Sequence, residues 1–180
     1  MSLEAEEWTP VAVPEIIWAF LKAEAHKFEL QSAGELITHP NFDDAAENEK
    51  RVELVCRINR DKILGHIPSD TSWFKVEFLQ NPHLHQLLFI GSGEWISDKD
   101  RNEFGLLPKR WPHLELKKHP SEWPPTILWG HSKAGPFTIL EGNHRYLAVA
   151  FLEQKPEVKL AVYVGLSNAP CVWHRPDQNF

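Results

Sequence analysis

The chain has 180 residues, of which 42% are hydrophobic, so it is long enough to bury a core as one domain of ordinary size. Its ten Phe and eight Trp must be buried somewhere, which argues against a disordered chain. Its formal net charge is −6, whereas proteins that bind the nucleic-acid backbone usually carry a broad basic face. A nucleic-acid partner is therefore an alternative that the net charge does not favour.

The two cysteines indicate the cellular compartment in which the protein is expected. Cys56 and Cys171 are too far apart in sequence to form a metal motif, and they favour a reducing, cytoplasmic location. No apolar run approaches the roughly 18 residues that a membrane span needs, and the acidic residues 1–8 do not resemble a signal peptide. We therefore expect no membrane partner, and the sequence leaves the oligomeric state undetermined.

The N-terminal part of the chain predicts a helix followed by a loop and a strand. Pro14 suits the first turn of a helix, within an N-terminal helical arm of about residues 10–30. Residues 41–50 are polar and predict a loop, whereas residues 52–58 alternate in polarity and predict a strand with Cys56 in the core. The apolar residues expected on one face of the helix are Ile17, Leu21, Ala25 and Phe28.

Further strands and one long excursion are expected beyond residue 70. Residues 106–125 hold five prolines and two tryptophans, and we interpret them as an ordered excursion from the domain. Strands are predicted at 73–78, 84–90, 126–129, 137–140 and 158–164, with a helix at 143–154 before the last of them. The whole chain, residues 1–180, is thus predicted to be a single α+β domain with a small mixed β-sheet and packed helices.

A strand–turn–helix corner at residues 140–148 is the best candidate for the functional site. Gly142 permits a sharp turn and the close approach of a ligand, and Asn143 is a favoured N-cap residue. The first-turn amides of the helix would then point outward at the positive end of its dipole, where phosphate or carboxylate binds. Arg145, in the same turn, can add a two-pronged contact to the anion.

Neighbouring side chains suggest chemistry at this corner. His144 can donate a hydrogen bond or a proton, and Glu141 can act as a base or hold a metal ion. His131 and Lys133 lie on the loop between the strands predicted at 126–129 and 137–140, and they are predicted to reach the same ligand. Glu141 and His144 are thus the catalytic candidates. The candidates for ligand binding are Gly142, Asn143, His144, Arg145, His131 and Lys133.

The run Glu141-Gly142-Asn143-His144-Arg145 resembles the Gly-x-x-Arg box of the ParB/sulfiredoxin-like superfamily. Its members include nucleotide-binding partition proteins, sulfiredoxins, free-serine kinases and ParB-like nuclease domains. Sulfiredoxins have Cys where this chain has Asn143, so sulfinic acid reduction is not expected. The serine kinases carry acidic, His and Arg residues at the positions of Glu141, His144 and Arg145, and this motif is nearer to theirs. The resemblance spans about ten residues.

The resemblance implies a ParB/sulfiredoxin-like fold and a phosphorylated small-molecule ligand. In that interpretation the ligand is a nucleoside triphosphate with Mg²⁺, bound for phosphoryl transfer or hydrolysis, and Glu141 is the metal ligand. The rival is a non-catalytic protein that binds an anion, another protein or a nucleic acid. Glu141 then has three alternative roles, as a catalytic base or metal ligand, as a residue of an anion-binding module, or as a structural partner of Arg145.

Two other patterns are weaker. Pro136-Phe137 with Glu141-Gly142-Asn143 partly resembles the Fic motif of AMP-transferring enzymes, but Gly135 stands where that motif needs its catalytic His. A helix at 137–140 would favour Fic, whereas a strand there favours the ParB/sulfiredoxin resemblance. His83 and His85 would share one face of a strand, yet no nearby carboxylate completes a metal signature.

Overall fold

The computed structural model of the chain describes residues 5–78, 87–89, 123–143, 145 and 162–172. Within these residues the strands are β1 (Ala5–Val11), β2 (Ser72–Phe78), β3 (Leu87–Phe89), β4 (Thr126–Gly130), β5 (Phe137–Glu141) and β6 (Val162–Leu166). The helices are α1 (Val13–Ala23), the 3₁₀ helix η1 (Phe28–Ala33), α2 (Gly34–Thr38), α3 (Ala45–Arg57) and α4 (Asp61–Leu64). These elements confirm the α+β class.

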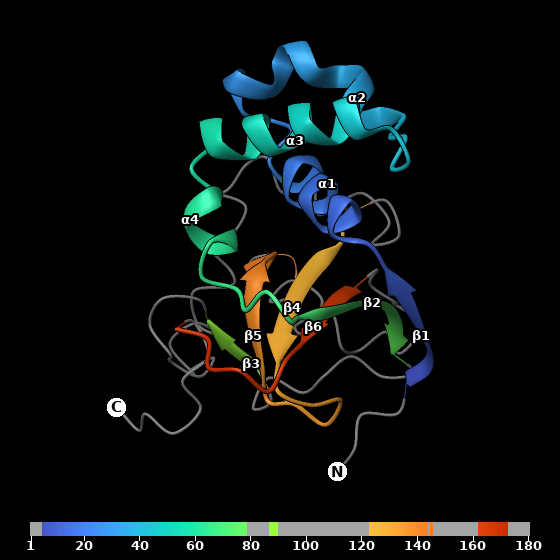
Figure 1. Cartoon of the computed structure of the whole chain (residues 1–180), viewed down its shortest axis with the longest axis vertical. Coiled ribbons are helices and arrows are strands. Elements are labelled where there is room, and N and C mark those ends of the chain that lie inside the picture. The colour runs from blue at the N-terminus through green and yellow to red at the C-terminus, as the bar shows by residue number, and fades with distance from the viewer. Residues whose placement is uncertain (1–4, 79–86, 90–122, 144, 146–161, 173–180) are drawn as a thin grey trace.

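The described strands form one mixed sheet in the order β1-β2-β6-β4-β5-β3. β4 runs parallel to β6, and β3 runs parallel to β5, whereas the other neighbours are antiparallel. Figure 1 shows the helices stacked at one end of the sheet, the end toward which β5 points. Glu141, the last residue of β5, therefore lies at the boundary between sheet and helices.

The predicted strands at 73–78, 126–129 and 137–140 are confirmed as β2, β4 and β5. Because residues 137–140 are a strand, the condition that would have favoured Fic is not met. The strand predicted at 158–164 is described only from Val162, and that at 84–90 only from Leu87. β1 was not expected from the sequence, because it is acidic and contains Pro10. As an edge strand, β1 tolerates both features.

The predicted helix at Pro14 is confirmed as α1, with Pro in its first turn, but it is shorter than expected. It ends at Ala23, before Ala25 and Phe28, and the Phe28 side chain is 80% exposed. Its buried residues are Ile16, Ala19, Phe20 and Leu21, so of the four residues expected on the apolar face only Leu21 is fully buried.

The strand predicted at 52–58 and the loop at 41–50 are wrong, because most of both segments forms α3. The Asp44 side chain accepts a hydrogen bond from the Glu47 amide at 3.0 Å and so caps the helix. Arg51, Leu54 and Val55 are its buried residues, at a helical spacing. Cys56 is exposed, so the prediction that it lies in the core is also wrong.

Two buried apolar clusters hold the described layers together. One lies between α1 and the sheet and includes Phe20, Ile127 and Trp129. The other lies among the helices and includes Leu21, Leu30 and Val55. Since α1 contributes buried residues to both clusters, it joins the helices to the sheet.

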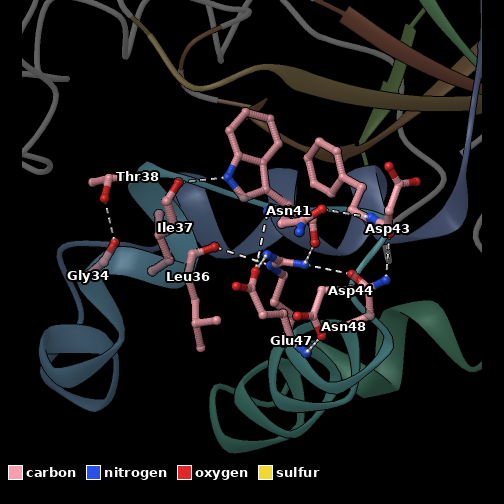
Figure 2. Close-up of polar contacts among 12 residues, drawn as sticks. Gly34, Leu36, Ile37, Thr38, Asn41, Asp43, Asp44, Glu47 and Asn48 are labelled. Carbon is pink, nitrogen blue, oxygen red and sulfur yellow. Dashed lines mark hydrogen bonds and ion pairs between the residues drawn. The ribbon is translucent and has the colours of Figure 1, made fainter.

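Arg51 is the polar centre of the helical layer and is fully buried. It donates to the Leu36 and Asn41 carbonyls, each at 3.2 Å, and to the Asn48 side chain at 2.6 Å. It also forms an ion pair with Glu47 at 2.5 Å. Figure 2 shows these polar contacts between α2, the following turn and α3. They fix α2 against α3, with Arg51 as the shared donor.

Among the described helices, none is long and apolar enough to cross a membrane. The excursion predicted at 106–125 lies outside the described residues up to residue 122, and the described Trp123 is buried. The His83 and His85 pair and most of the helix predicted at 143–154 also lie outside the described residues.

Candidate functional site

The corner begins where β5 ends at Glu141 and Gly142 turns the chain. Gly142 has φ +100°, a conformation that favours glycine, which confirms that the residue makes the turn after a strand. Asn143 is already helical, and its Oδ1 has no hydrogen-bond partner, so Asn143 does not cap the helix as predicted. The turn leaves Gly142 in the cap position instead.

Gly142 lies in a narrow polar cradle. A Cβ atom at this position would stand 2.8 Å from the Thr126 hydroxyl oxygen and 3.0 Å from Arg145 Nη2. Thr126, at the start of β4, is fully buried, and its Oγ1 has no hydrogen-bond partner. The absence of a side chain at Gly142 therefore leaves a hydroxyl and a guanidinium facing the same small space.

Arg145 is turned inward and only 8% exposed. Its Nη2 donates to the Pro125 carbonyl at 3.3 Å and to Glu141 Oε1 at 3.4 Å, while its Nε has no partner. Charge-assisted hydrogen bonds are usually about 2.7–2.9 Å long, so these two hydrogen bonds are long and weak. Burial lowers the pKa of Arg145 below its ordinary value, and the Glu141 carboxylate opposes that shift.

Glu141 lies between two arginines. Its Oε1 is 3.4 Å from Arg145 Nη2, and its Oε2 is 3.4 Å from Nη2 of Arg60, which precedes α4. The side chain of Glu141 is 13% exposed, so solvent reaches it only slightly. Each carboxylate oxygen already faces a cation, which is an arrangement for pairing charges and not an open set of metal ligands.

Arg60 is the residue of this site that the sequence analysis missed. It also pairs with Glu24 at the end of α1, and Glu24 in turn contacts Lys27 at 3.1 Å. Glu24 is only 5% exposed, so the contact with Arg60 compensates a buried carboxylate. Because Arg60 and Glu141 are 81 positions apart in the sequence, no local motif could have revealed the contact.

His131 and Lys133 lie at the other end of the β4–β5 hairpin. Gly130 pairs with Phe137 near their loop, whereas Ile127 pairs with Glu141 near the corner. The four residue steps along β5 separate the two ends by roughly 13 Å, at about 3.3 Å per residue. His131 Nδ1 lies 2.8 Å from the Ser167 carbonyl oxygen, and the Lys133 ammonium lies 4.8 Å from the Trp8 ring. The structure does not bring these two side chains to Arg145.

Four of the predicted site residues lie together at the corner. The structure brings Glu141, Gly142, Asn143 and Arg145 together at the corner, whereas His144 lies outside the described residues. In the part of the chain that the structure describes, no group of three or more His, Cys, Asp or Glu residues is placed to hold a metal ion. Glu141 thus has no such partner among the described residues.

An apolar pocket of about 440 Å³ lies elsewhere, between α1, α3, α4 and the start of β2. The exposed Cys56 lies on its wall, together with Val52, Leu64 and Trp73. The pocket shares no lining residue with the corner, so it is not part of this site.

No protein-family model, no curated protein and no solved structure matches this chain.

Proposed function

We propose that the corner at Gly142 binds the phosphate group of a small phosphorylated ligand, in a domain of the ParB/sulfiredoxin-like kind. One observation carries the proposal. Around Glu141 and Gly142, the buried donor atoms Arg60 Nε, Thr126 Oγ1 and Arg145 Nε all lack a hydrogen-bond partner. Buried polar atoms are nearly always paired, and several unpaired donors in one place fit an anionic ligand.

The charges and the shape of the corner agree with an anion. Arg60, Arg145 and Lys27 bring three positive charges against the two carboxylates of Glu141 and Glu24, which leaves this connected group of charges with an excess of one positive charge. Gly142 brings the main chain close to the Thr126 hydroxyl and the Arg145 guanidinium, where a larger residue would collide. The corner therefore combines an electrostatic preference for an anion with hydrogen-bond donors gathered around the turn.

In the finer form of the proposal, the ligand is a nucleoside triphosphate with Mg²⁺, and the reaction is phosphoryl transfer or hydrolysis. The described residues do not by themselves fit a magnesium site, because both oxygens of Glu141 face guanidinium groups. Magnesium is commonly held by one or two carboxylates together with the substrate phosphates. The metal in this proposal therefore arrives with the nucleotide, and Glu141 acts as a proton acceptor in a cytoplasmic enzyme.

The second candidate is an anion-binding module without catalysis. It is favoured by the pairing of Glu141 with two arginines, since a carboxylate in that position need not take part in a reaction. Replacing Glu141 by Gln separates the candidates, because Gln keeps the shape of the side chain and removes its charge.

We expect Arg145→Ala to weaken phosphate or nucleotide binding by about 1.5–3 kcal/mol, the range for a hydrogen bond to a charged group. The matched control is Arg57→Ala, since Arg57 also pairs with a glutamate four residues earlier, Glu53, but is 61% exposed. Isothermal titration with ATP, CTP and GTP, with and without magnesium, measures the effect. If the unaltered protein binds none of them at millimolar concentration, the nucleotide proposal is wrong.

The enzyme is tested in the same preparations by phosphate release from each nucleotide, with small hydroxy amino acids offered as acceptors. The enzyme proposal expects turnover that Glu141→Gln abolishes, together with retained or tighter phosphate binding. Background release from both proteins, with tighter binding by Glu141→Gln, would support the module. A small loss of stability with unchanged binding would instead make Glu141 a structural partner of Arg145.

A further inference from the structure

Arg60 reaches the corner from the helical layer. It follows Asn59, which has φ +58°, and its amide donates to the Val55 carbonyl at 3.0 Å where α3 ends. The turn between α3 and α4 thus fixes the backbone of Arg60. From there the guanidinium contacts Glu24 of the helical layer and Glu141 of the sheet. A ligand held by Arg60 and Arg145 would therefore touch both layers.

The Glu141 carboxylate stands where an external anion would be expected. One oxygen faces Arg60 and the other faces Arg145, each at 3.4 Å, so the carboxylate bridges two guanidinium groups. The Nε atoms of both arginines remain without partners. Guanidinium groups have five N–H donors in a planar fork that matches phosphate oxygens. The internal carboxylate uses only part of this donor set.

We propose that Arg60 and Arg145 form a two-arginine site for a phosphate dianion, and that Glu141 is an internal anion which the ligand displaces. The inference rests on the proposed function and names the ligand class of the same corner. A singly charged anion would only replace the one charge of Glu141, whereas a dianion can match the two positive charges that remain when Arg60, Arg145 and Lys27 face Glu24 alone. The ligand class is therefore a phosphate monoester or the terminal phosphate of a nucleotide, and not a simple carboxylate.

Glu24 keeps Arg60 in place during this exchange. It is buried and pairs with Arg60 independently of Glu141, so Arg60 retains a partner after the Glu141 carboxylate moves away. The side chain of Arg60 is 30% exposed, whereas that of Arg145 is 10% exposed. We therefore infer that the ligand approaches from the side of Arg60 and meets Arg145 last.

The test is titration of the full chain with inorganic phosphate at about pH 8, where phosphate is chiefly the dianion, and with acetate as the singly charged comparison. Glu141→Gln should bind phosphate about tenfold or more tightly than the unaltered protein, since it removes the negative charge that competes with phosphate for the two arginines. The matched control Glu53→Gln, from the exposed pair, should leave phosphate affinity unchanged. Acetate should bind more weakly than phosphate to every variant.

Removal of Arg60 needs a variant that remains folded. Arg60→Ala would leave Glu24 buried without its partner, so the variant of choice is the double replacement Arg60→Ala with Glu24→Gln. Its circular dichroism should match the unaltered protein, and its phosphate affinity should fall about tenfold or more. Arg60→Lys, which keeps the charge but loses the planar fork, should give an intermediate affinity. Arg57→Ala is again the control.

The outcomes separate the two proposals. If Arg145→Ala loses phosphate binding while both Arg60 variants bind as tightly as the unaltered protein, the two-arginine site is wrong and the phosphate corner stands. Unchanged phosphate affinity in Glu141→Gln would overturn the displacement of Glu141. Equal binding of acetate and phosphate would overturn the dianion. If neither the unaltered protein nor Glu141→Gln binds phosphate, both proposals fail together.

Discussion

At the scale of single residues, Gly142 determines both the backbone turn and the space between the side chains of the site. Its φ of +100° is costly for other residues, and an added Cβ would crowd the Thr126 hydroxyl and the Arg145 guanidinium. The turn at Gly142 was predicted correctly from the sequence, because a glycine between an apolar run and a polar helix start usually marks a turn. The inward turn of Arg145 did not follow from the motif, since a helical spacing alone does not tell which face is buried.

We expect Gly142→Ala to lower the free energy of unfolding by about 1–3 kcal/mol, because the residue would be strained and the cradle overfilled. Gly34→Ala is the matched control, since Gly34 has a right-handed helical conformation and no atom within 4 Å of an added Cβ. That control should be neutral or stabilising by up to about 1 kcal/mol. Urea denaturation of both variants measures the difference, and equal stabilities would contradict the strain at Gly142.

At the scale of elements, the sequence predicted strands better than helices. β2, β4 and β5 carry enough β-branched and aromatic residues that their short apolar runs had one interpretation. In α3 the end of the helix alternates in polarity, which suggested a strand. Asp44 and Glu47, spaced as in a helix-capping pair, were the signal that would have indicated a helix instead.

The same helix shows why a hydrophobic pattern was not enough. Its most buried residue is Arg51, so a position of the buried face appeared polar in the sequence. Burial of this arginine is possible because a carbonyl of α2 and a carbonyl of the turn before α3 accept its hydrogen bonds. Such an arrangement depends on contacts 10 and 15 residues away, which periodicity does not reveal.

We expect Arg51→Ala to destabilise the fold by about 3 kcal/mol or more, because the Leu36 and Asn41 carbonyls lose a donor and a buried side chain leaves a cavity. The control Arg57→Ala, an exposed change in the same helix, should alter stability by no more than about 0.5 kcal/mol. Thermal denaturation followed by circular dichroism compares them. Similar melting temperatures would show that Arg51 does not hold α2 against α3.

At the scale of the whole molecule, α1 packs against the sheet closely enough to influence the ionisation of a side chain in β6. Tyr163 of β6 lies in the cluster that α1 shares with the sheet, and burial, with a smaller contribution from Glu15 of α1, raises its pKa to about 12. The phenol is therefore neutral in the folded protein at a pH where the unfolded chain begins to ionise it. Alkaline stability then reports on the contact between the layers.

The sign of the effect follows from proton binding. Between the ordinary pKa of 10.0 and the folded value of about 12, the folded state binds more protons than the unfolded chain, so stability falls as pH rises. Below pH 10 both states hold the proton, and Tyr163 adds no pH dependence. We expect Tyr163→Phe to flatten the decline from pH 10 to 12 in urea denaturation. An equally steep decline in both proteins would assign it to other groups.

The position of β6 in the sheet has a consequence for the order in which the chain acquires structure. β6 inserts between β2 and β4, so among the described strands β1 and β2 have only each other as neighbours until residues 162–166 are added. Two-stranded ribbons are marginally stable in water, and closing a loop between β2 and β6 has a large entropic cost. During translation, the N-terminal helices can therefore pack together early, whereas the sheet cannot be completed until β6 has been synthesised. High contact order of this kind makes folding slow and leaves strand edges exposed during synthesis.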